Sequence, residues 1–153
     1  MVVALAAAGR VPVILDNYAN SDPGVVARLR ELTGQPLAAV DADVRDLDAL
    51  RRTFGDHPIG AVVHCAGLKA VGEGEARPLA YYDVNVGGTF ALAQVMGEAG
   101  VGTFVFSSSA TVYGQPDALP VAESAPLRPQ SVYGRTKRAI EEFLRHPPHA
   151  NPH

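Results

Sequence analysis

Short apolar runs alternate with longer helix-forming segments along most of this chain. The apolar runs are rich in β-branched or aromatic residues, which is typical of strands, and they cover 11–15, 37–40, 61–65 and 103–106. The segments that follow them have the length and composition of helices, and they cover 22–32, 46–54, 78–97 and 131–145. Strands joined through helices pair in parallel, and helices cover both faces of such a sheet. The alternation therefore predicts an α/β fold on a doubly wound parallel sheet, with strands buried on both sides.

Composition restricts the partners that the chain can have. Its 153 residues suit one domain, and its formal net charge of -3 argues against a nucleic-acid or membrane partner. No apolar run approaches the ~20 residues that a membrane helix needs. Cys65 is the only cysteine, which excludes an intrachain disulfide and a multi-cysteine metal site. The apolar run around Cys65 and His64 predicts that both are packed core residues. We expect a cytoplasmic protein that binds no metal.

Polar residues collect where the predicted strands end. In an open parallel sheet, ligands bind beyond the carboxyl ends of the strands. The polar and glycine residues that follow the strands are Asp16 and Asn17, Asp41 and Asp43, Gly67 to Lys69, and Ser107 to Ser109. This edge of the sheet is therefore the predicted binding site. The connections at 69–74 and 115–130 are rich in glycine and proline, respectively, and are predicted to be loops.

Tyr133 and Lys137 form the pair with the most specific chemistry. They lie four residues apart in a predicted helix, so their side chains share one face. A free tyrosine, with a pKa near ~10, is a poor base at neutral pH, but a neighbouring cation stabilises the phenolate and so favours proton transfer. Taken alone, a tyrosine and a lysine at this spacing are more often an ordinary exposed pair. Ser109 and Asp16, each at a predicted strand end, favour the catalytic interpretation.

The beginning of the chain departs from the pattern of a dinucleotide-binding fold. In such folds an acid at the place of Asp16 binds the adenosine ribose, and a glycine-rich phosphate loop precedes it by about 20 residues. Only fifteen residues precede Asp16, and they contain no GxxGxxG. The segment 2–9 resembles the second half of the helix that follows such a loop. We therefore expect 1–145 to form a partial NAD-binding domain without the first strand and the glycine-rich loop, followed by a disordered proline- and histidine-rich tail at 146–153.

Six stretches of the chain occur in an order and spacing that are specific as a set. They are LDNYANS at 15–21, DADVR at 41–45, HCAGLKAVGE at 64–73, YYDVNVGGT at 81–89, FSSSATVYG at 106–114 and PQSVYGRTK at 129–137. Together they resemble the extended short-chain dehydrogenase/reductase family, which has a Rossmann-like fold, and within it most closely the UDP-glucose 4-epimerases. The resemblance covers residues 2 to about 145, and the stretch AGLKAVGE favours the epimerases over their relatives.

The resemblance implies a role for each matching residue. Asp16 would bind the adenosine ribose, and its charge favours NAD over NADP because it would repel a 2′-phosphate. Tyr133 would be the catalytic base, Ser109 would hydrogen-bond the reacting oxygen of the sugar, and Lys137 would bind the nicotinamide ribose and favour the phenolate. The remaining residues implied in cofactor binding are Asn17, Tyr18, Asn20 and Ser21 near the ribose, Asp43 and Val44 beside the adenine, and Cys65, Ala66, Gly67 and Lys69 beside the nicotinamide half and the phosphates.

The implied reaction is the reversible interconversion of UDP-galactose and UDP-glucose through a 4-keto sugar, with NAD as a bound cofactor and homodimeric full-length relatives. One departure from the family is Val84, where the epimerases often have an asparagine, although Asn85 keeps the YxxN spacing. Another NAD-dependent nucleotide-sugar epimerase or a dehydratase is one alternative; a dehydratase, however, needs an acid–base pair where Ala110 and Thr111 stand. A truncated, non-catalytic remnant is the other alternative.

Overall fold

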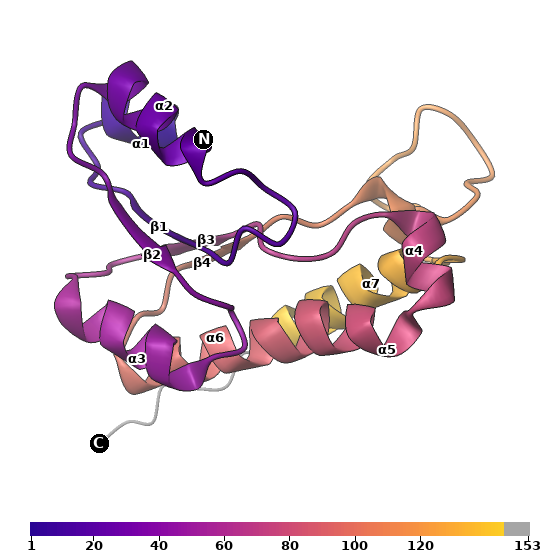
Figure 1. Cartoon of the computed structure of the whole chain (residues 1–153). Coiled ribbons are helices and arrows are strands. Elements are labelled where there is room, and N and C mark those ends of the chain that lie inside the picture. The colour runs from indigo at the N-terminus through magenta and orange to yellow at the C-terminus, as the bar shows by residue number, and fades with distance from the viewer. Residues whose placement is uncertain (146–153) are drawn as a thin grey trace.

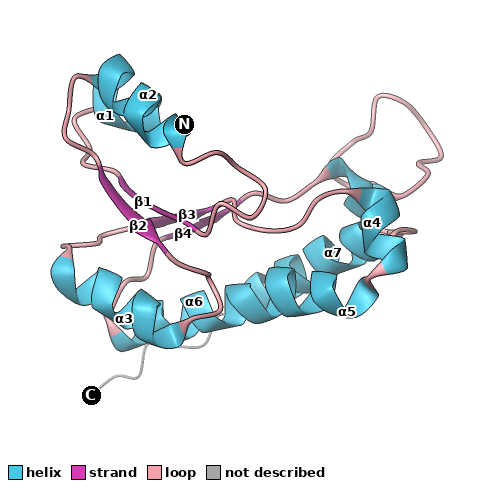
Figure 2. Cartoon of the chain, in the orientation of Figure 1, coloured by secondary structure: helices cyan, strands magenta, loops and turns pink. Residues whose placement is uncertain are grey.

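Strands cross the middle of the molecule, and helices lie on both sides of them (Figure 1, Figure 2). The computed structural model describes residues 1–145. In this range the strands are β1 (Val13–Asp16), β2 (Ala38–Asp41), β3 (Val62–His64) and β4 (Phe104–Phe106). The helices are α1 (Val2–Ala7), α2 (Gly24–Thr33), α3 (Leu47–Asp56), α4 (Val71–Ala76), α5 (Pro78–Tyr81), the π-helical turn η1 (Tyr82–Gly87), α6 (Gly88–Glu98), the 3-10 turn η2 (Ala110–Tyr113) and α7 (Val132–Arg145). Helices α1 and α2 lie on one side of the strands, and α3, α6 and α7 lie on the other.

The strands pair in parallel, as predicted, but they do so in two separate ladders. β1 pairs with β2 so that Asp16 lies opposite Asp41, and β3 pairs with β4 so that His64 lies opposite Phe106. Among the described residues, no ladder joins one pair to the other. The sequence predicted one sheet, whereas the described strands form two sheets of two strands each. In each pair the carboxyl ends lie together, which gathers the loops that follow the strands.

Local signals explain where the helices begin and end. Asp46 caps α3, because its carboxylate accepts hydrogen bonds from the backbone N–H groups of Asp48 and Ala49, both at 3.0 Å. Gly34 follows α2 in the left-handed conformation, with a φ of 64°, which glycine adopts without steric cost. Gly9 follows α1 in the same way, with a φ of 74°. A left-handed glycine therefore follows the end of both helices.

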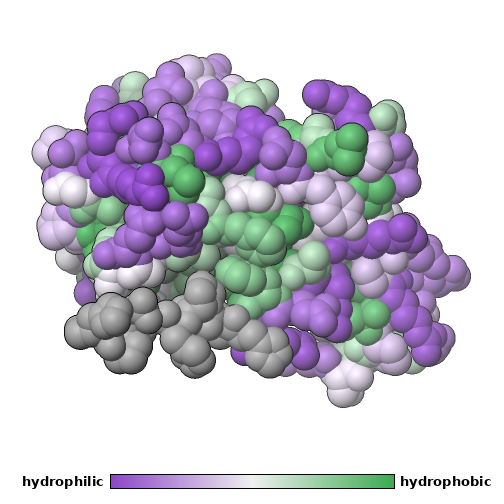
Figure 3. All heavy atoms as spheres, turned by 90° about the horizontal axis from the view of Figure 1, so that it is seen from below, coloured by the Kyte–Doolittle hydropathy of each residue, from purple (hydrophilic) through white to green (hydrophobic). Residues whose placement is uncertain are grey.

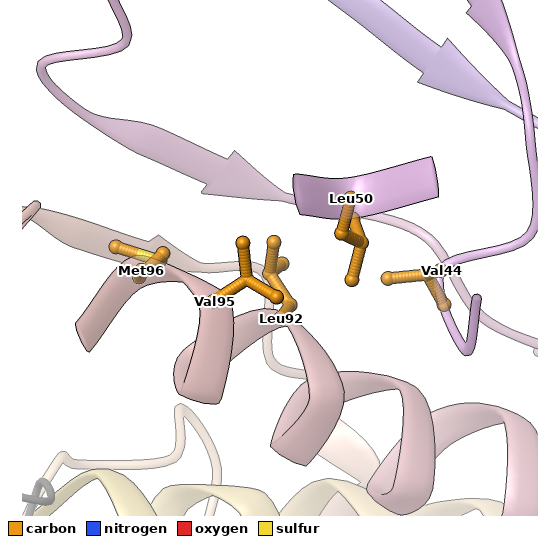
Figure 4. Close-up of a cluster of buried hydrophobic side chains, with 5 residues drawn as sticks. All are labelled: Val44, Leu50, Leu92, Val95 and Met96. Atoms are coloured by element: carbon orange, nitrogen blue, oxygen red, sulfur yellow. The ribbon is translucent and has the colours of Figure 1, made fainter. Parts of the chain in front are cut away.

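The main hydrophobic core lies between the strands and the helices α3 and α6 (Figure 4). Its buried members are Val44, Leu50, Leu92, Val95 and Met96. Leu15 of β1, Val62 of β3 and Phe104 of β4 pack against this cluster. Gly88 allows α6 to come close, since a Cβ at this position would lie 2.5 Å from a methyl carbon of Val44. Both strand pairs are therefore fixed to one shared core, although no ladder connects them.

Two expectations about burial are wrong. The strands are not buried on both faces, because Val105 in β4 is 52% exposed. Side chains alternate across a strand, so Phe104 packs against the core while Val105 faces the opposite side. Cys65 is exposed rather than packed in the core. The reason is that β3 ends at His64 and the chain leaves the sheet at the next residue.

Two elements also differ from those predicted. The segment expected to be a glycine-rich loop at 69–74 contains most of α4. This short helix is held by Tyr81, whose hydroxyl donates to the carbonyl of Ala70 at 2.6 Å and whose ring lies 3.2 Å from the place of a Cβ on Gly74. The helix predicted at 78–97 is interrupted by the π-helical turn η1. The proline-rich connection at 115–130 contains no α-helix or strand, as predicted.

Among residues 1–145, no helix has the length and apolar character needed to cross a membrane. The same residues contain no group of three or more histidine, cysteine or acidic side chains arranged to hold a metal ion. The tail at 146–153, which was expected to be disordered, lies outside the described residues.

His64 is a buried histidine, as predicted, and its titration should affect stability. It is 3% exposed, and burial, with a smaller contribution from the charge of Lys137, lowers the pKa of its imidazole to about 4 from 6.5. Between these values the unfolded chain binds a proton that the folded chain does not. The free energy of unfolding should therefore fall as the pH is lowered from about 6.5 through about 4, by up to about 3 kcal/mol.

Urea denaturation at several pH values measures this effect, and His64→Gln is its control. The Nε2 atom of His64 lies 3.0 Å from the hydroxyl of Thr89, and a glutamine amide can keep a polar contact there without titrating. The variant should lose this part of the pH dependence. Equal slopes of stability against pH in the two proteins would show that His64 does not cause it.

Candidate functional site

The loop after β1 is organised around the carboxylate of Asp16. One oxygen accepts a hydrogen bond from the backbone N–H of Tyr18 at 2.8 Å, and the other accepts one from the hydroxyl of Ser21 at 3.1 Å. Tyr18 has a φ of 55°, a left-handed conformation that is uncommon for a residue with a large side chain. The tight turn folds the loop back onto Asp16. The carboxylate is thereby held at the carboxyl end of β1, half-buried and with its orientation fixed.

Two asparagines of this loop connect it to the loops that follow β2 and β3. The Nδ2 atom of Asn17 donates to a carboxylate oxygen of Asp43 at 2.9 Å. The Nδ2 atom of Asn20 donates to the backbone carbonyl of Gly67 at 3.2 Å. These contacts join residues that are far apart in the sequence. They bring the predicted cofactor residues of three loops to one edge of the molecule.

Asp43 and Val44 occupy different environments at the end of β2. Arg45 donates hydrogen bonds to both oxygens of Asp43, at 2.9 and 2.7 Å, and these bonds hold the pKa of the Asp43 carboxyl well below its usual range. Arg45 also forms an ion pair with Asp83 of η1. Val44 is 7% exposed and belongs to the hydrophobic core. Asp43 therefore presents an ionised carboxylate at neutral pH, whereas the Val44 side chain faces the interior.

Arg45 is a residue of this edge that sequence reasoning did not single out. It lies inside the stretch DADVR, two residues after Asp43. This spacing is the sequence feature that could have identified it. Its contact with Asp83 joins the loop after β2 to the helix that contains η1. Such a contact between residues distant in the sequence cannot be deduced from one sequence alone.

The loop after β3 contains the other predicted cofactor residues. Cys65, Ala66 and Lys69 are exposed, and Gly67 is half-buried. Gly67 has a φ of 151°, and a Cβ on it would lie 2.8 Å from the amide oxygen of Asn85. Only glycine therefore permits the observed approach of this loop to the helix at η1. The exposed residues of the loop face outward, where a ligand can reach them.

Lys137 lies directly beside Tyr133, as the helical spacing predicted. Lys137 is 5% exposed, and its Nζ atom lies 5.8 Å from the ring centroid of Tyr133 and 4.6 Å from that of Phe106. The ammonium donates a hydrogen bond to the backbone carbonyl of Ser107 at 2.8 Å. Burial lowers the pKa of Lys137, and the charge of Cys65 opposes this effect. α7 thus places a phenol and an amine together at the carboxyl end of β4.

Ser109 lies at the start of the turn η2, which follows β4. Its hydroxyl oxygen accepts hydrogen bonds from the backbone N–H and the hydroxyl of Thr111, at 3.2 and 2.9 Å. The turn η2 packs against α7, and Gly134 permits the contact, since a Cβ there would lie 2.8 Å from the carbonyl of Thr111. Gly134, which follows Tyr133 in the sequence, is thus in contact with the turn that begins at Ser109.

A hollow of about 400 Å³ lies next to β4, but it is separate from the predicted site. Its lining includes Ser108, Tyr113 and Glu141 and none of the predicted catalytic or cofactor residues. The predicted residues instead form an open edge, along which the loops after β1, β2 and β3 lead to α7. This arrangement offers carboxylates and amides at one end and a phenol, an amine and a hydroxyl at the other. It suits an extended ligand with hydroxyl groups and a site of proton transfer.

Comparisons with known proteins agree with the fold. The model of the NAD dependent epimerase/dehydratase family matches residues 1–149. The UDP-glucose 4-epimerase of Yersinia pestis is 48% identical over 143 residues, which cover 93% of this chain and 42% of that protein. The UDP-glucose 4-epimerase of Bacillus subtilis is 46% identical over 133 residues, which cover 87% of this chain and 39% of that protein.

Solved structures show the same similarity. The UDP-glucose 4-epimerase of Stenotrophomonas maltophila, with bound NAD and formylated UDP-arabinopyranose, matches with a TM-score of 0.91 and 45% identity over 94% of this chain and 43% of that chain. The enzyme of Bifidobacterium longum, in complex with NAD+ and UDP, matches with a TM-score of 0.92 and 42% identity over the same shares. The chain spans less than half the length of these relatives. The resemblance inferred from the six sequence stretches is confirmed.

Proposed function

The chain belongs to the NAD dependent epimerase/dehydratase family, and we propose that the protein containing it is a UDP-glucose 4-epimerase with NAD as its bound cofactor. The observation that carries this proposal is the meeting of Tyr133 and Lys137 at the carboxyl end of β4. A base with an adjacent cation suits the removal of a proton from a sugar hydroxyl. The relatives named above are UDP-glucose 4-epimerases, and we therefore propose the interconversion of UDP-galactose and UDP-glucose as the reaction.

The residues at the strand ends fit NAD. The Asp16 carboxylate is fixed by Tyr18 and Ser21 and provides the acceptor that a ribose diol requires. Its negative charge disfavours a 2′-phosphate, and therefore NADP. Asp43 would face the adenine, and the exposed Ala66 and Lys69 would lie beside the nicotinamide half and the phosphates.

Each catalytic side chain then has one task. When bound, NAD supplies the acceptor and donor of a hydride at C4 of the sugar. Tyr133 takes the proton of the 4-hydroxyl and returns it when the sugar is reduced from its other face. Lys137, held by the carbonyl of Ser107, favours the ionised phenol by its charge. Ser109 donates its hydroxyl proton to the reacting oxygen, and Thr111 orients that hydroxyl.

The two strand pairs support a further part of the proposal. No ladder joins β1 to β3 within the described residues, although both strands pack on one core. We propose that the complete protein places a strand between them and a phosphate-binding loop after it. The remainder of the sugar site would also come from residues beyond 1–145, because the relatives are more than twice as long as the matched part.

The experiment that tests this function is the assay of purified complete protein for bound NAD and for conversion of UDP-galactose to UDP-glucose. Bound NAD with conversion is expected. Bound NAD with conversion only of a uronic or N-acetylated UDP-sugar would favour another epimerase of the family. Loss of water from the sugar would favour a dehydratase, although Ala110 stands near Ser109 where such an enzyme needs an acid or base. Neither NAD nor conversion would favour the non-catalytic alternative.

We also propose that two copies of the protein associate through the outer face of α6 and α7. Phe90 of α6 is 46% exposed, and its ring lies 4.6 Å from that of Phe143 on α7. Tyr82, at the start of η1, is 42% exposed. Figure 3 looks onto this helical side and shows apolar surface gathered between polar regions. Exposed aromatic residues on paired helices are typical of an interface.

Phe90→Glu should therefore convert a dimer of the complete protein into monomers, because burial of an unpaired carboxylate in an apolar interface is unfavourable. Sedimentation velocity measures the change. Leu32→Glu is the matched control, since Leu32 is 55% exposed on α2, on the other side of the strands (Figure 1). If Phe90→Glu sediments as wild type does, the interface lies elsewhere.

A further inference from the structure

The first turn of α7, which contains Tyr133, is bonded to a side chain from a distant part of the chain. Val132 is the first residue of α7, and its backbone N–H donates a hydrogen bond to the carboxylate of Glu75 at 2.7 Å. Glu75 lies in α4, 57 residues earlier. The N–H groups of a first helical turn have no acceptor within their own helix. Glu75 therefore satisfies a donor that α7 leaves free, and the proposed chemistry gives this carboxylate no role.

The contact has the chemistry of a helix cap. A hydrogen bond to an ionised acceptor is shorter and stronger than one between neutral groups, and a carboxylate is favourable near the positive end of a helix. Glu75 is exposed, so ordering its side chain costs conformational entropy that offsets part of this gain. The net effect on stability is consequently small. The main consequence of the bond is geometric, because it fixes where the backbone of α7 begins relative to α4.

α4 is itself held firmly, so Glu75 extends from a fixed support. The hydroxyl of Tyr81 donates to the carbonyl of Ala70 at 2.6 Å and to the carboxylate of Glu73 at 3.2 Å. Tyr81 is fully buried, and its ring lies 3.2 Å from the place of a Cβ on Gly74. These contacts fix α4 from its start to Gly74, and Glu75 is the next residue.

The residues on both sides of Tyr133 are fixed by different elements. Gly134, which follows it, donates its backbone N–H to the hydroxyl of Ser131 at 3.0 Å. A Cβ on Gly134 would lie 2.8 Å from the carbonyl of Thr111, so η2 also touches the first turn here. Val132, which precedes Tyr133, is held from α4. The position of the phenol therefore depends on two supports, and removal of either allows the first turn of α7 to tilt.

We propose that Glu75 is a positioning residue that fixes the start of α7 and, through it, the phenol of Tyr133. This inference rests on the proposed function, which makes that phenol the base. Proton transfer requires reacting atoms in a narrow geometry, and a misplacement of about 1 Å can cost about 100-fold in rate. Glu75 acts through the backbone of Val132 and exchanges no proton with the sugar. The reach of its side chain, rather than its charge, is what the role requires.

The test uses the complete protein with bound NAD and two variants, Glu75→Asp and Glu75→Gln. Aspartate keeps the charge, but its side chain is shorter by one methylene and cannot reach Val132 unless α7 moves. Glutamine keeps the length and an acceptor oxygen but loses the charge. The value of kcat for UDP-galactose should fall by about 5- to 20-fold in Glu75→Asp and stay within about twofold of wild type in Glu75→Gln. KM should change by less than about threefold in both, and hydrogen exchange at the Val132 amide should become faster only in Glu75→Asp.

Glu73→Asp is the matched control, since it makes the same change in the same helix. The Glu73 carboxylate bonds to Arg77 at 3.0 Å and to Tyr81 at 3.2 Å instead of to α7. Its loss should therefore leave kcat within about twofold of wild type.

A wild-type kcat in Glu75→Asp would overturn the proposal. A fall of kcat in Glu75→Gln equal to that in Glu75→Asp would also overturn it, because the charge would then be required. A pH dependence of kcat shifted to lower pH in Glu75→Gln would overturn it as well, since removal of a nearby negative charge favours the phenolate. If the complete wild-type protein converts no UDP-sugar, the proposed function fails and hydrogen exchange decides alone: faster exchange at Val132 only in Glu75→Asp supports the positioning role, and equal exchange in both variants overturns it.

Discussion

Tyr133→Phe should slow the conversion of UDP-galactose by about 10²- to 10⁴-fold, which is the usual contribution of general acid–base catalysis. The substitution removes only the phenolic oxygen, which is the proposed base. The ring would remain next to the ammonium of Lys137, which lies 5.8 Å from its centroid. KM and the content of bound NAD should therefore change little. Initial rates with the complete protein and the absorbance of released NAD measure both quantities.

Tyr82→Phe is the control for this experiment. It makes the same chemical change at a residue that is 42% exposed and that is none of the proposed catalytic or cofactor residues. Its rate should equal that of wild type. If Tyr133→Phe retains more than about a tenth of the wild-type rate, a tyrosine base is excluded, since the removal of a catalytic acid or base costs more.

The location of the site could be predicted from the sequence because it depends on topology. Parallel strands bring their carboxyl ends to one edge, so Asp16, Asp43 and Gly67 were expected to lie together. The hydrogen bonds from Asn17 to Asp43 and from Asn20 to Gly67 confirm it. These contacts follow from the order of strands and loops, and the sequence pattern contains that order.

The side-chain contacts that join the loops of the candidate site to η1 could not be predicted in the same way. Arg45 meets Asp83 and Asn85 meets Leu68 across long intervals of sequence, and only the folded chain brings them together. The misprediction of Cys65 has a local cause, because a strand that ends one residue earlier turns a core position into an exposed one.

Tertiary contacts also determine the backbone of two segments whose secondary structure was not predicted correctly from the sequence pattern. The segment 71–76 contains two glycines, which disfavour a helix by about 1 kcal/mol each relative to alanine. It is nevertheless helical, because Tyr81 bonds to Ala70 and packs on Gly74. The π-helical turn at 82–87 likewise lies inside a segment that was predicted to be one continuous helix. In both places the packing partner determines the backbone, and one sequence does not reveal the partner.

Lys137→Met should lower the rate by about 10²- to 10³-fold, the range for loss of one fixed electrostatic contact in an active site, and should reduce the content of bound NAD. Methionine nearly keeps the length and apolar stem of the lysine but removes its charge. Lys137 is 5% exposed, and burial lowers its pKa. The wild-type activity depends on this cation. As the pH rises, the activity should consequently be lost at a lower pH than that at which a free lysine titrates.

The expected effect on stability separates this loss from unfolding. Burial of a charge is unfavourable, and the replacement of a buried charge by an apolar group is often neutral or stabilising. With NAD removed from both proteins, the Tm of Lys137→Met should therefore equal or exceed that of wild type, while the rate of the loaded enzyme falls. Arg135→Met, which removes an exposed cation from the same helix, should change neither quantity. A fall in Tm large enough to explain the lost rate would mean that Lys137 acts by supporting the fold, whereas a lower rate at unchanged Tm assigns it to the chemistry of Tyr133.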